Sequence, residues 1–225
     1  MVSIEKICKQ LSDKIADELS LDSQRRAVVN YGLFAMIQTA ISILTTILFG
    51  AVFGVLVPAL ILSLASAILR KYSGGAHAKT PESCALIGVL ISVGGALSLS
   101  YIKWQIMSVL LCGIGVFVFA FFWVYQLAPV DSLAKPIKNI EKQQLLKKKS
   151  MLIVSVYLVI ASVLIGISLI TYHDELLLFT VCLYGGILWQ VFTLTKSGHL
   201  LVNKIDVFLI HTILRQRGEL QNEKN

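Results

Sequence analysis

The chain alternates between long apolar runs and short polar segments rich in lysine and arginine. Residues 27–69 contain no Asp, Glu, Lys or Arg, which is too long for one membrane crossing of about 20 residues. We therefore expect two helices joined by a tight turn near residues 50–54, where glycines occur. With the charge-free runs that follow, the pattern predicts six spans, at residues 32–49, 51–69, 84–100, 105–127, 151–171 and 176–195.

Composition supports a membrane protein. Hydrophobic residues make up 56% of the chain and charged residues only 15%, whereas soluble domains carry about 25% charged residues. Spanning helices satisfy their own backbone hydrogen bonds in lipid. The predicted fold class is therefore all-α, a polytopic integral membrane protein forming a single domain over residues 1–225. Between and beside its spans we expect an amphipathic N-terminal helix (1–25), a polar loop (70–83), a basic loop (128–150) and a tail (196–225).

Basic residues predict the orientation of the chain. Six spans place both termini and the two polar loops on one side, and 19 of the 20 Lys and Arg residues then lie there. Only Lys103 remains for the far side. Because cytoplasmic loops carry the excess of Lys and Arg, the termini and the 70–83 loop are predicted to be cytoplasmic.

The N-terminal segment is predicted to form an amphipathic helix. Its apolar residues recur at helical spacing between charged ones, and no apolar core precedes a small-residue cleavage site, so a cleavable signal peptide is not expected. This helix could lie on the inner membrane surface or pack on the cytoplasmic face of the bundle. The apolar positions are Ile4, Ile7, Leu11, Ile15 and Leu19.

One polar stretch, RKYSGGAHAKTPESCAL at residues 70–86, carries candidate chemistry in His77 and Cys84. Seven residues of straight helix would separate the two by about 10 Å, too far for a hydrogen bond. Pro81 between them is typical of the first residue of a helix, and Thr80 can cap it. We therefore expect Cys84 in the first turn of the third span.

That placement favours a reactive cysteine. The free N–H groups and the dipole of a helix N-terminus favour the thiolate of Cys84 and could also bind an oxyanion. A turn at Gly74 and Gly75 could bring His77 back to Cys84, and a Cys–His pair is the activated nucleophile of cysteine peptidases. Spacing alone also allows purely structural roles for both. Two ligands are too few for zinc, so we expect no metal and no cofactor.

The motif resembles that of the AgrB family, membrane endopeptidases of Gram-positive quorum sensing. That family has an Arg before a Ser-Gly-Gly turn, a His two residues after the second Gly and a Cys seven residues beyond the His. The segment APVDSLAKPIKNIEKQQLLKKKS, at residues 128–150, also resembles the Ala-Pro…Pro-Ile segment and lysines of the family. The matching motif residues are Arg70, Ser73, Gly74, Gly75, His77 and Cys84.

The resemblance implies a function and a substrate. Cys84 would be the nucleophile and His77 the general base, with the other motif residues in support. The substrate would be an AgrD-like precursor peptide, whose C-terminal tail is removed through an acyl-enzyme thioester. The retained part then closes into a thiolactone or lactone autoinducing peptide. The resemblance also implies a plasma-membrane location and is compatible with a homodimer in the lipid bilayer; no nucleic-acid partner is expected.

Several assignments stay open at this level. Glu82 is a candidate to orient His77, although an acidic residue in a first turn also suits the helix dipole. The lysines at 147–149 could attract an acidic substrate tail, or could reflect cytoplasmic topology alone. A non-enzymatic peptide exporter and a thiol or metal sensor that uses Cys84 are the alternative functions. The three lysines in question are Lys147, Lys148 and Lys149.

Overall fold

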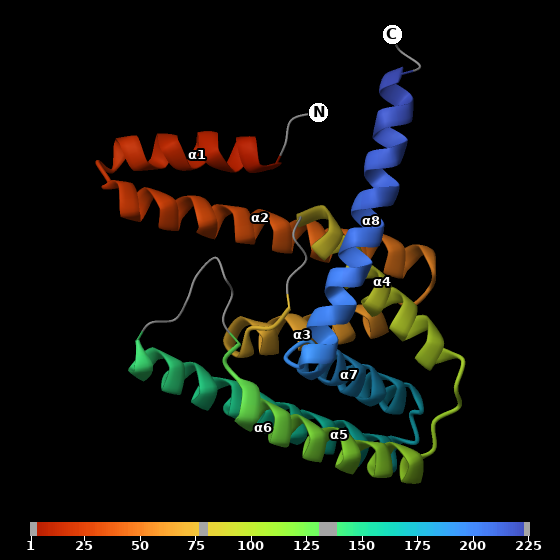
Figure 1. Ribbon diagram of the computed structural model, residues 1–225. Coiled ribbons are helices and arrows are strands. Elements are labelled where there is room, and N and C mark those ends of the chain that lie inside the picture. Colours follow the sequence, from red (N-terminus) through yellow and green to blue (C-terminus); the bar gives the residue numbers. More distant parts are fainter. Residues whose placement is uncertain (1–3, 77–80, 131–138, 223–225) are drawn as a thin grey trace. The chain divides into compact units, whose positions relative to one another are not determined.

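The computed structural model describes residues 4–76, 81–130 and 139–222, and these residues are largely helical (Figure 1). Within these residues no strand occurs, and their one β-type contact is an isolated bridge between Gly74 and Val130. The prediction of an all-α protein is confirmed. In chain order the helices are α1 (Ile4–Glu18), α2 (Ser23–Val52), α3 (Leu56–Ser73), α4 (Pro81–Ser100), α5 (Ile106–Leu127), α6 (Ile140–Thr171), α7 (Glu175–Phe192) and α8 (Lys196–Asn222).

Five helices of the described part are long and apolar enough to cross a membrane, which supports a polytopic membrane protein. They correspond to the last five predicted spans. The first predicted span, 32–49, falls within α2, whose apolar part Met36–Val52 is shorter than the other five. The number six therefore stays a prediction. The five candidate spans are Leu56–Ser73, Ser83–Ser100, Ile106–Leu127, Ile140–Thr171 and Glu175–Phe192.

The predicted break between the first two apolar helices lies where expected. Helix α2 ends at Val52 and α3 begins at Leu56. Gly54 between them has a φ of 70°, which glycine adopts without the steric cost that other residues meet. The glycines near residues 50–54 were therefore enough to predict this turn from the sequence.

The chain divides into two compact units, Met1–Thr45 and Thr46–Asn225. In the first unit, α1 is the predicted N-terminal helix, and among residues 8–18, whose side chains the structure describes, the buried ones are the small Cys8, Ser12 and Ala16. Leu11 from the predicted apolar stripe is 41% exposed. Helix α1 thus keeps an apolar side chain outward, as a surface helix requires, and its place on the membrane stays a prediction.

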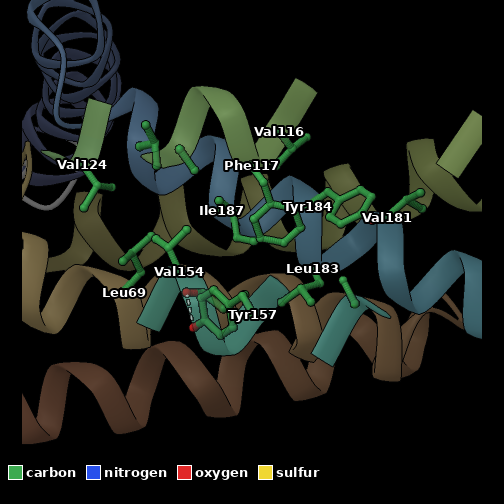
Figure 2. Packing of buried hydrophobic residues seen from close by; sticks show 14 of the residues in the cluster. Leu69, Val116, Phe117, Val124, Val154, Tyr157, Val181, Leu183, Tyr184 and Ile187 are labelled. Atoms are coloured by element: carbon green, nitrogen blue, oxygen red, sulfur yellow. Dashed lines mark hydrogen bonds between the residues drawn. The ribbon is translucent and has the colours of Figure 1, made fainter. Parts of the chain in front are cut away.

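In the second unit, α3 and α7 pack closely around small residues. A Cβ atom on Gly186 of α7 would come within 2.5 Å of the Leu62 carbonyl oxygen and 2.8 Å of the Ala65 side chain. Small residues allow helix backbones to approach in membrane proteins. The hydroxyl of Tyr157 on α6 donates to the Ala65 carbonyl at 2.8 Å, inside the apolar cluster shown in Figure 2. This packing places the C-terminal ends of α3 and α7 together.

Residues 140–150 differ from the loop expected there, because they form the first turns of α6. The side chain of Asn139 accepts hydrogen bonds from the backbone N–H groups of Glu141 and Lys142, at 2.8 and 3.3 Å. Asn is among the best N-cap residues. A search for charge-free runs cannot detect this start, since the cap and the first helical turns are polar.

Candidate active site

The structure describes the two ends of the predicted motif. It describes residues 70–76, at the end of α3, and the side chains from Ser83 onward in α4. His77 lies outside the described residues, and so does the side chain of Glu82. The geometry of the site is therefore built from Arg70 to Ala76 and from Cys84.

The Ser-Gly-Gly turn ends α3 in a conformation that requires glycine. Gly74 has a φ of 69° and a ψ of −150° and caps α3 by donating its N–H to the Arg70 carbonyl at 3.0 Å. Gly75 follows with a φ of 131°. Both values lie in regions that residues with a Cβ rarely adopt. The turn predicted at these two glycines is confirmed.

One side of this turn lies against the segment that follows α5. The N–H of Val130 donates to the Ser73 carbonyl at 2.8 Å, and Gly74 and Val130 form the isolated bridge. A Cβ atom on Gly74 would overlap the Val130 carbonyl oxygen. The two segments that carry the family resemblance in the sequence, the 70–84 motif and residues 128–150, thus bond to each other through Ser73, Gly74 and Val130.

The other side of the turn lies against the end of α7. The N–H of Ala76 donates to the Thr193 carbonyl at 3.0 Å. A Cβ atom on Gly75 would lie 2.7 Å from the Thr193 hydroxyl oxygen. Glycine at position 75 is therefore needed for close approach as well as for its backbone conformation.

The side chain of Gln190, on α7, donates hydrogen bonds to the same turn. Its Nε2 donates to the Ser73 hydroxyl at 3.0 Å and to the Gly74 carbonyl at 2.7 Å. Gln190 and Ser73 are both fully buried. The Ser73 hydroxyl also donates to the Leu69 carbonyl at 3.0 Å, so the serine links the last turn of α3 to α7.

Ala76 links the two described ends of the motif. Its carbonyl oxygen accepts a hydrogen bond from the Arg70 guanidinium, and its side chain shares a buried cluster with Ile87 of α4, three residues after Cys84. The positive charge of Arg70 also interacts with Cys84. The structure therefore brings the α3 turn and the beginning of α4 into one site.

Cys84 lies in the first turn of a helix, as predicted. Helix α4 begins at Pro81, and Cys84 is its fourth residue, a half-buried free thiol. Thr80, the expected cap, lies outside the described residues. The first-turn N–H groups of a helix lack intrahelical acceptors, so Cys84 has the backbone setting that stabilises an anion.

The lysines expected to bind a substrate tail lie on α6 and near the site. The ammonium of Lys149 is 5.6 Å from the ring centroid of Tyr72, which precedes Ser73. Lys147 is 4.1 Å from the ring centroid of Tyr125, near the end of α5. Lys148 is exposed between them in the sequence. At least one of these lysines therefore borders the motif.

Gln190 and Thr193 are site residues that the motif search missed. They lie at the end of the predicted span 176–195, more than 100 residues after the motif, and their bonds to it depend on helix packing. A polar glutamine in an otherwise apolar run is a signal that could have marked the first of them.

Helix α8 adds an apolar cover that was also missed. Val202 of α8 forms a buried cluster with Ala76 and with Ile87 of α4, and Ile205 packs against this cluster. Ile87 lies three residues after Cys84, on the same helix side. The site is thus flanked by apolar side chains from the tail helix.

The family model and the known proteins that match this chain share one family description. Residues 8–194 match a family model described as AgrB, accessory gene regulator B. The chain is 38% identical over 212 residues to AgrB-like protein 2 of Clostridium perfringens strain 13, covering 91% of this chain and 97% of that protein. It is 37% identical over 214 residues to an AgrB-like protein of C. perfringens strain SM101, with coverage of 91% and 97%. No solved structure matches the chain.

Proposed function

Because the chain belongs to the AgrB family, which is involved in processing accessory gene regulator quorum-sensing peptides, we propose that it is a membrane cysteine endopeptidase. In this proposal the substrate is an AgrD-like precursor peptide. The enzyme removes the C-terminal tail of the precursor and promotes closure of the remaining peptide into a thiolactone or lactone ring.

The observation that carries the proposal is the contact between the motif turn and the helix of Cys84, where Ala76 and Ile87 share one buried cluster. The Arg70 guanidinium also donates to the Ala76 carbonyl. Ala76 is directly bonded to His77 in the chain, and Ile87 lies three residues after Cys84. This contact supports a Cys84–His77 pair in spite of the seven-residue spacing.

In the proposed mechanism, His77 accepts the proton of the Cys84 thiol, and the thiolate attacks the precursor's carbonyl carbon at the cleavage point. First-turn N–H groups of α4 stabilise the oxyanion. The C–N bond then breaks, the tail's new amino group takes the proton from His77, and an acyl-enzyme thioester remains. A Cys or Ser side chain of the bound peptide attacks this thioester, which closes the ring and restores the Cys84 thiol.

Ring closure must compete with hydrolysis of the thioester. Exclusion of water from an active site suppresses hydrolysis of reactive intermediates. The apolar cover formed by Ala76, Ile87 and Val202 beside the motif supports such a sheltered site. The energy of the cleaved peptide bond is then retained in the ring instead of being lost to water.

We test this proposal by co-expressing the chain with a candidate precursor and analysing both by mass spectrometry. The expected result is a free C-terminal tail peptide together with a thioester-linked adduct on Cys84, which hydroxylamine removes. Tail release with no adduct at Cys84 under trapping conditions, combined with an adduct on another residue, would contradict the assignment of the nucleophile.

We infer that the active site faces the cytoplasm, because the basic residues lie on its side of the predicted spans and the precursor is made in the same cell. A membrane-impermeant thiol reagent is expected to modify Cys84 in inside-out vesicles and to leave it unmodified in right-side-out vesicles. Modification in right-side-out vesicles alone would reverse the orientation.

We propose that the lysines of α6 attract the acidic tail of the precursor. Lys149 lies beside Tyr72 and therefore borders the Ser-Gly-Gly turn, and charges at such an edge steer a substrate more than they bind it. The double change Lys147→Gln and Lys149→Gln is expected to raise the KM for the precursor about three- to tenfold at low salt, with kcat nearly unchanged.

Salt separates this role from an effect on folding. Exposed charges are screened at high ionic strength, so the difference in KM should shrink toward zero in about 0.5 M salt. Lys103→Gln, which removes the basic residue of the predicted far side, is the matched control. An equal rise in KM for Lys103→Gln, or no dependence on salt, would contradict tail steering.

A further inference from the structure

We propose that Gln190 is a positioning residue for the reaction at Cys84, an inference that rests on the proposed endopeptidase function. Its amide donates to the Ser73 hydroxyl at 3.0 Å and to the Gly74 carbonyl at 2.7 Å. It is fully buried and lies 117 residues after Ser73. Gln190 therefore acts on the turn of the motif, since among the described residues its side chain donates only to Ser73 and Gly74.

The orientation of this amide is fixed by its partner. The Gly74 carbonyl can only accept a hydrogen bond, so the atom 2.7 Å from it must be the donor Nε2. The other atom, Oε1, is then buried without a hydrogen-bond partner among the described residues. A buried unpaired oxygen destabilises a fold, so an apolar residue of similar length would serve packing better. The hydrogen bonds that its Nε2 donates to Ser73 and Gly74 therefore explain why glutamine occupies this position.

The contacts of Gln190 reach the helix of Cys84 through the turn of the motif. Ser73 and Gly74 start the turn, and two residues later Ala76 bonds to Thr193 through its N–H at 3.0 Å. The carbonyl of Ala76 accepts from Arg70, and the side chain of Ala76 packs with Ile87 of α4, three residues after Cys84. Loss of the Gln190 donors would remove two of the bonds that hold the start of the turn, so the turn would position Arg70 and the helix of Cys84 less firmly.

Two variants test the role of the amide. Gln190→Met keeps the length of the side chain without its donors, and Gln190→Glu places acceptor oxygens against the Gly74 carbonyl. Both are expected to lower kcat for tail release about ten- to 100-fold, as a small misplacement of reacting groups does, while KM changes by less than about threefold. Gln190→Glu should be at least as slow as Gln190→Met.

Thr180→Val is the matched control, because Thr180 is also a fully buried polar residue of α7. Its hydroxyl bonds within the helix, to the Leu176 carbonyl at 2.8 Å, about 15 Å along the axis from Gln190. Rates are expressed per folded chain, from the monodisperse fraction in detergent. If Gln190→Met loses folded chain but keeps the same rate per folded chain as Thr180→Val, Gln190 has only a structural role.

A double-variant cycle tests whether Gln190 acts through the turn. If it does, Ser73→Ala combined with Gln190→Met should lose much less than the product of the two single losses, since both remove the same link. Multiplicative losses would contradict the coupling, and a wild-type kcat for Gln190→Met would overturn the proposal.

The alkylation rate of Cys84 tests the positioning role of Gln190 independently of the proposed endopeptidase function. Alkylation of Cys84, followed by mass spectrometry of the intact chain and its peptides, is expected to be several-fold slower in Gln190→Met than in wild type or Thr180→Val. Full tail release by a Cys84→Ala chain would refute the proposed nucleophile without deciding on Gln190. An unchanged alkylation rate at Cys84 in Gln190→Met would refute the positioning role.

Discussion

Replacement of Cys84 by alanine is expected to abolish release of the precursor's C-terminal tail, a loss on the order of 10⁴-fold or more when the nucleophile of a covalent mechanism is removed. Cys84 stands among the first four residues of α4, and no other cysteine of the described residues lies that close to the start of a helix. The measurement is quantitative mass spectrometry of tail peptide in cells that co-express the precursor, normalised to chain in the membrane.

Matched cysteine changes give the comparison for this prediction. Cys112→Ala removes an exposed cysteine from α5 and should leave tail release unchanged. His77→Ala should lower it about 10²- to 10⁴-fold, the usual contribution of a general acid–base group. Cleavage at the wild-type rate by the Cys84→Ala chain would exclude Cys84 as the nucleophile.

The second large effect is expected from Gly74→Ala, a change of one methyl group. At a φ of 69° and ψ of −150°, a residue with a Cβ is strained by about 1–3 kcal/mol. The added carbon would also overlap the carbonyl oxygen of Val130, which is backbone and cannot rotate away. We expect the bond from Val130 to Ser73 to break and tail release to fall about 100-fold or more.

Gly94→Ala is the control for Gly74→Ala, because Gly94 lies on α4, the helix that carries Cys84, and a Cβ there meets nothing within 4 Å. Alanine is favoured over glycine within a helix by about 0.5–1 kcal/mol, so Gly94→Ala should keep wild-type activity and stability. Wild-type tail release by Gly74→Ala would show that the turn is not required in the conformation described.

Local sequence signals determined where several helices begin and which candidate site residues lie in their first turns. Pro81 marks the first residue of α4, because proline fits the first turn of a helix and few other helical positions. That one residue placed Cys84 in a first turn before any tertiary information. The same local reasoning failed for residues 140–150, where the Asn139 cap starts α6 in a polar region that the search for apolar runs excludes.

The sequence by itself determined the membrane class, the apolar helices and the motif with its glycine turn, since each depends on composition or on neighbours within a few residues. The tertiary structure alone decided what holds that turn. Val130 and Gln190 bond to Ser73 across 57 and 117 residues, and Ala76 packs with Ile87 of the helix that carries Cys84. Such partners depend on how α3 packs against α7 through Gly186 and Ala65. The periodicity of a helix predicts which of its faces is buried, but it does not predict which side chains of another helix that face will contact.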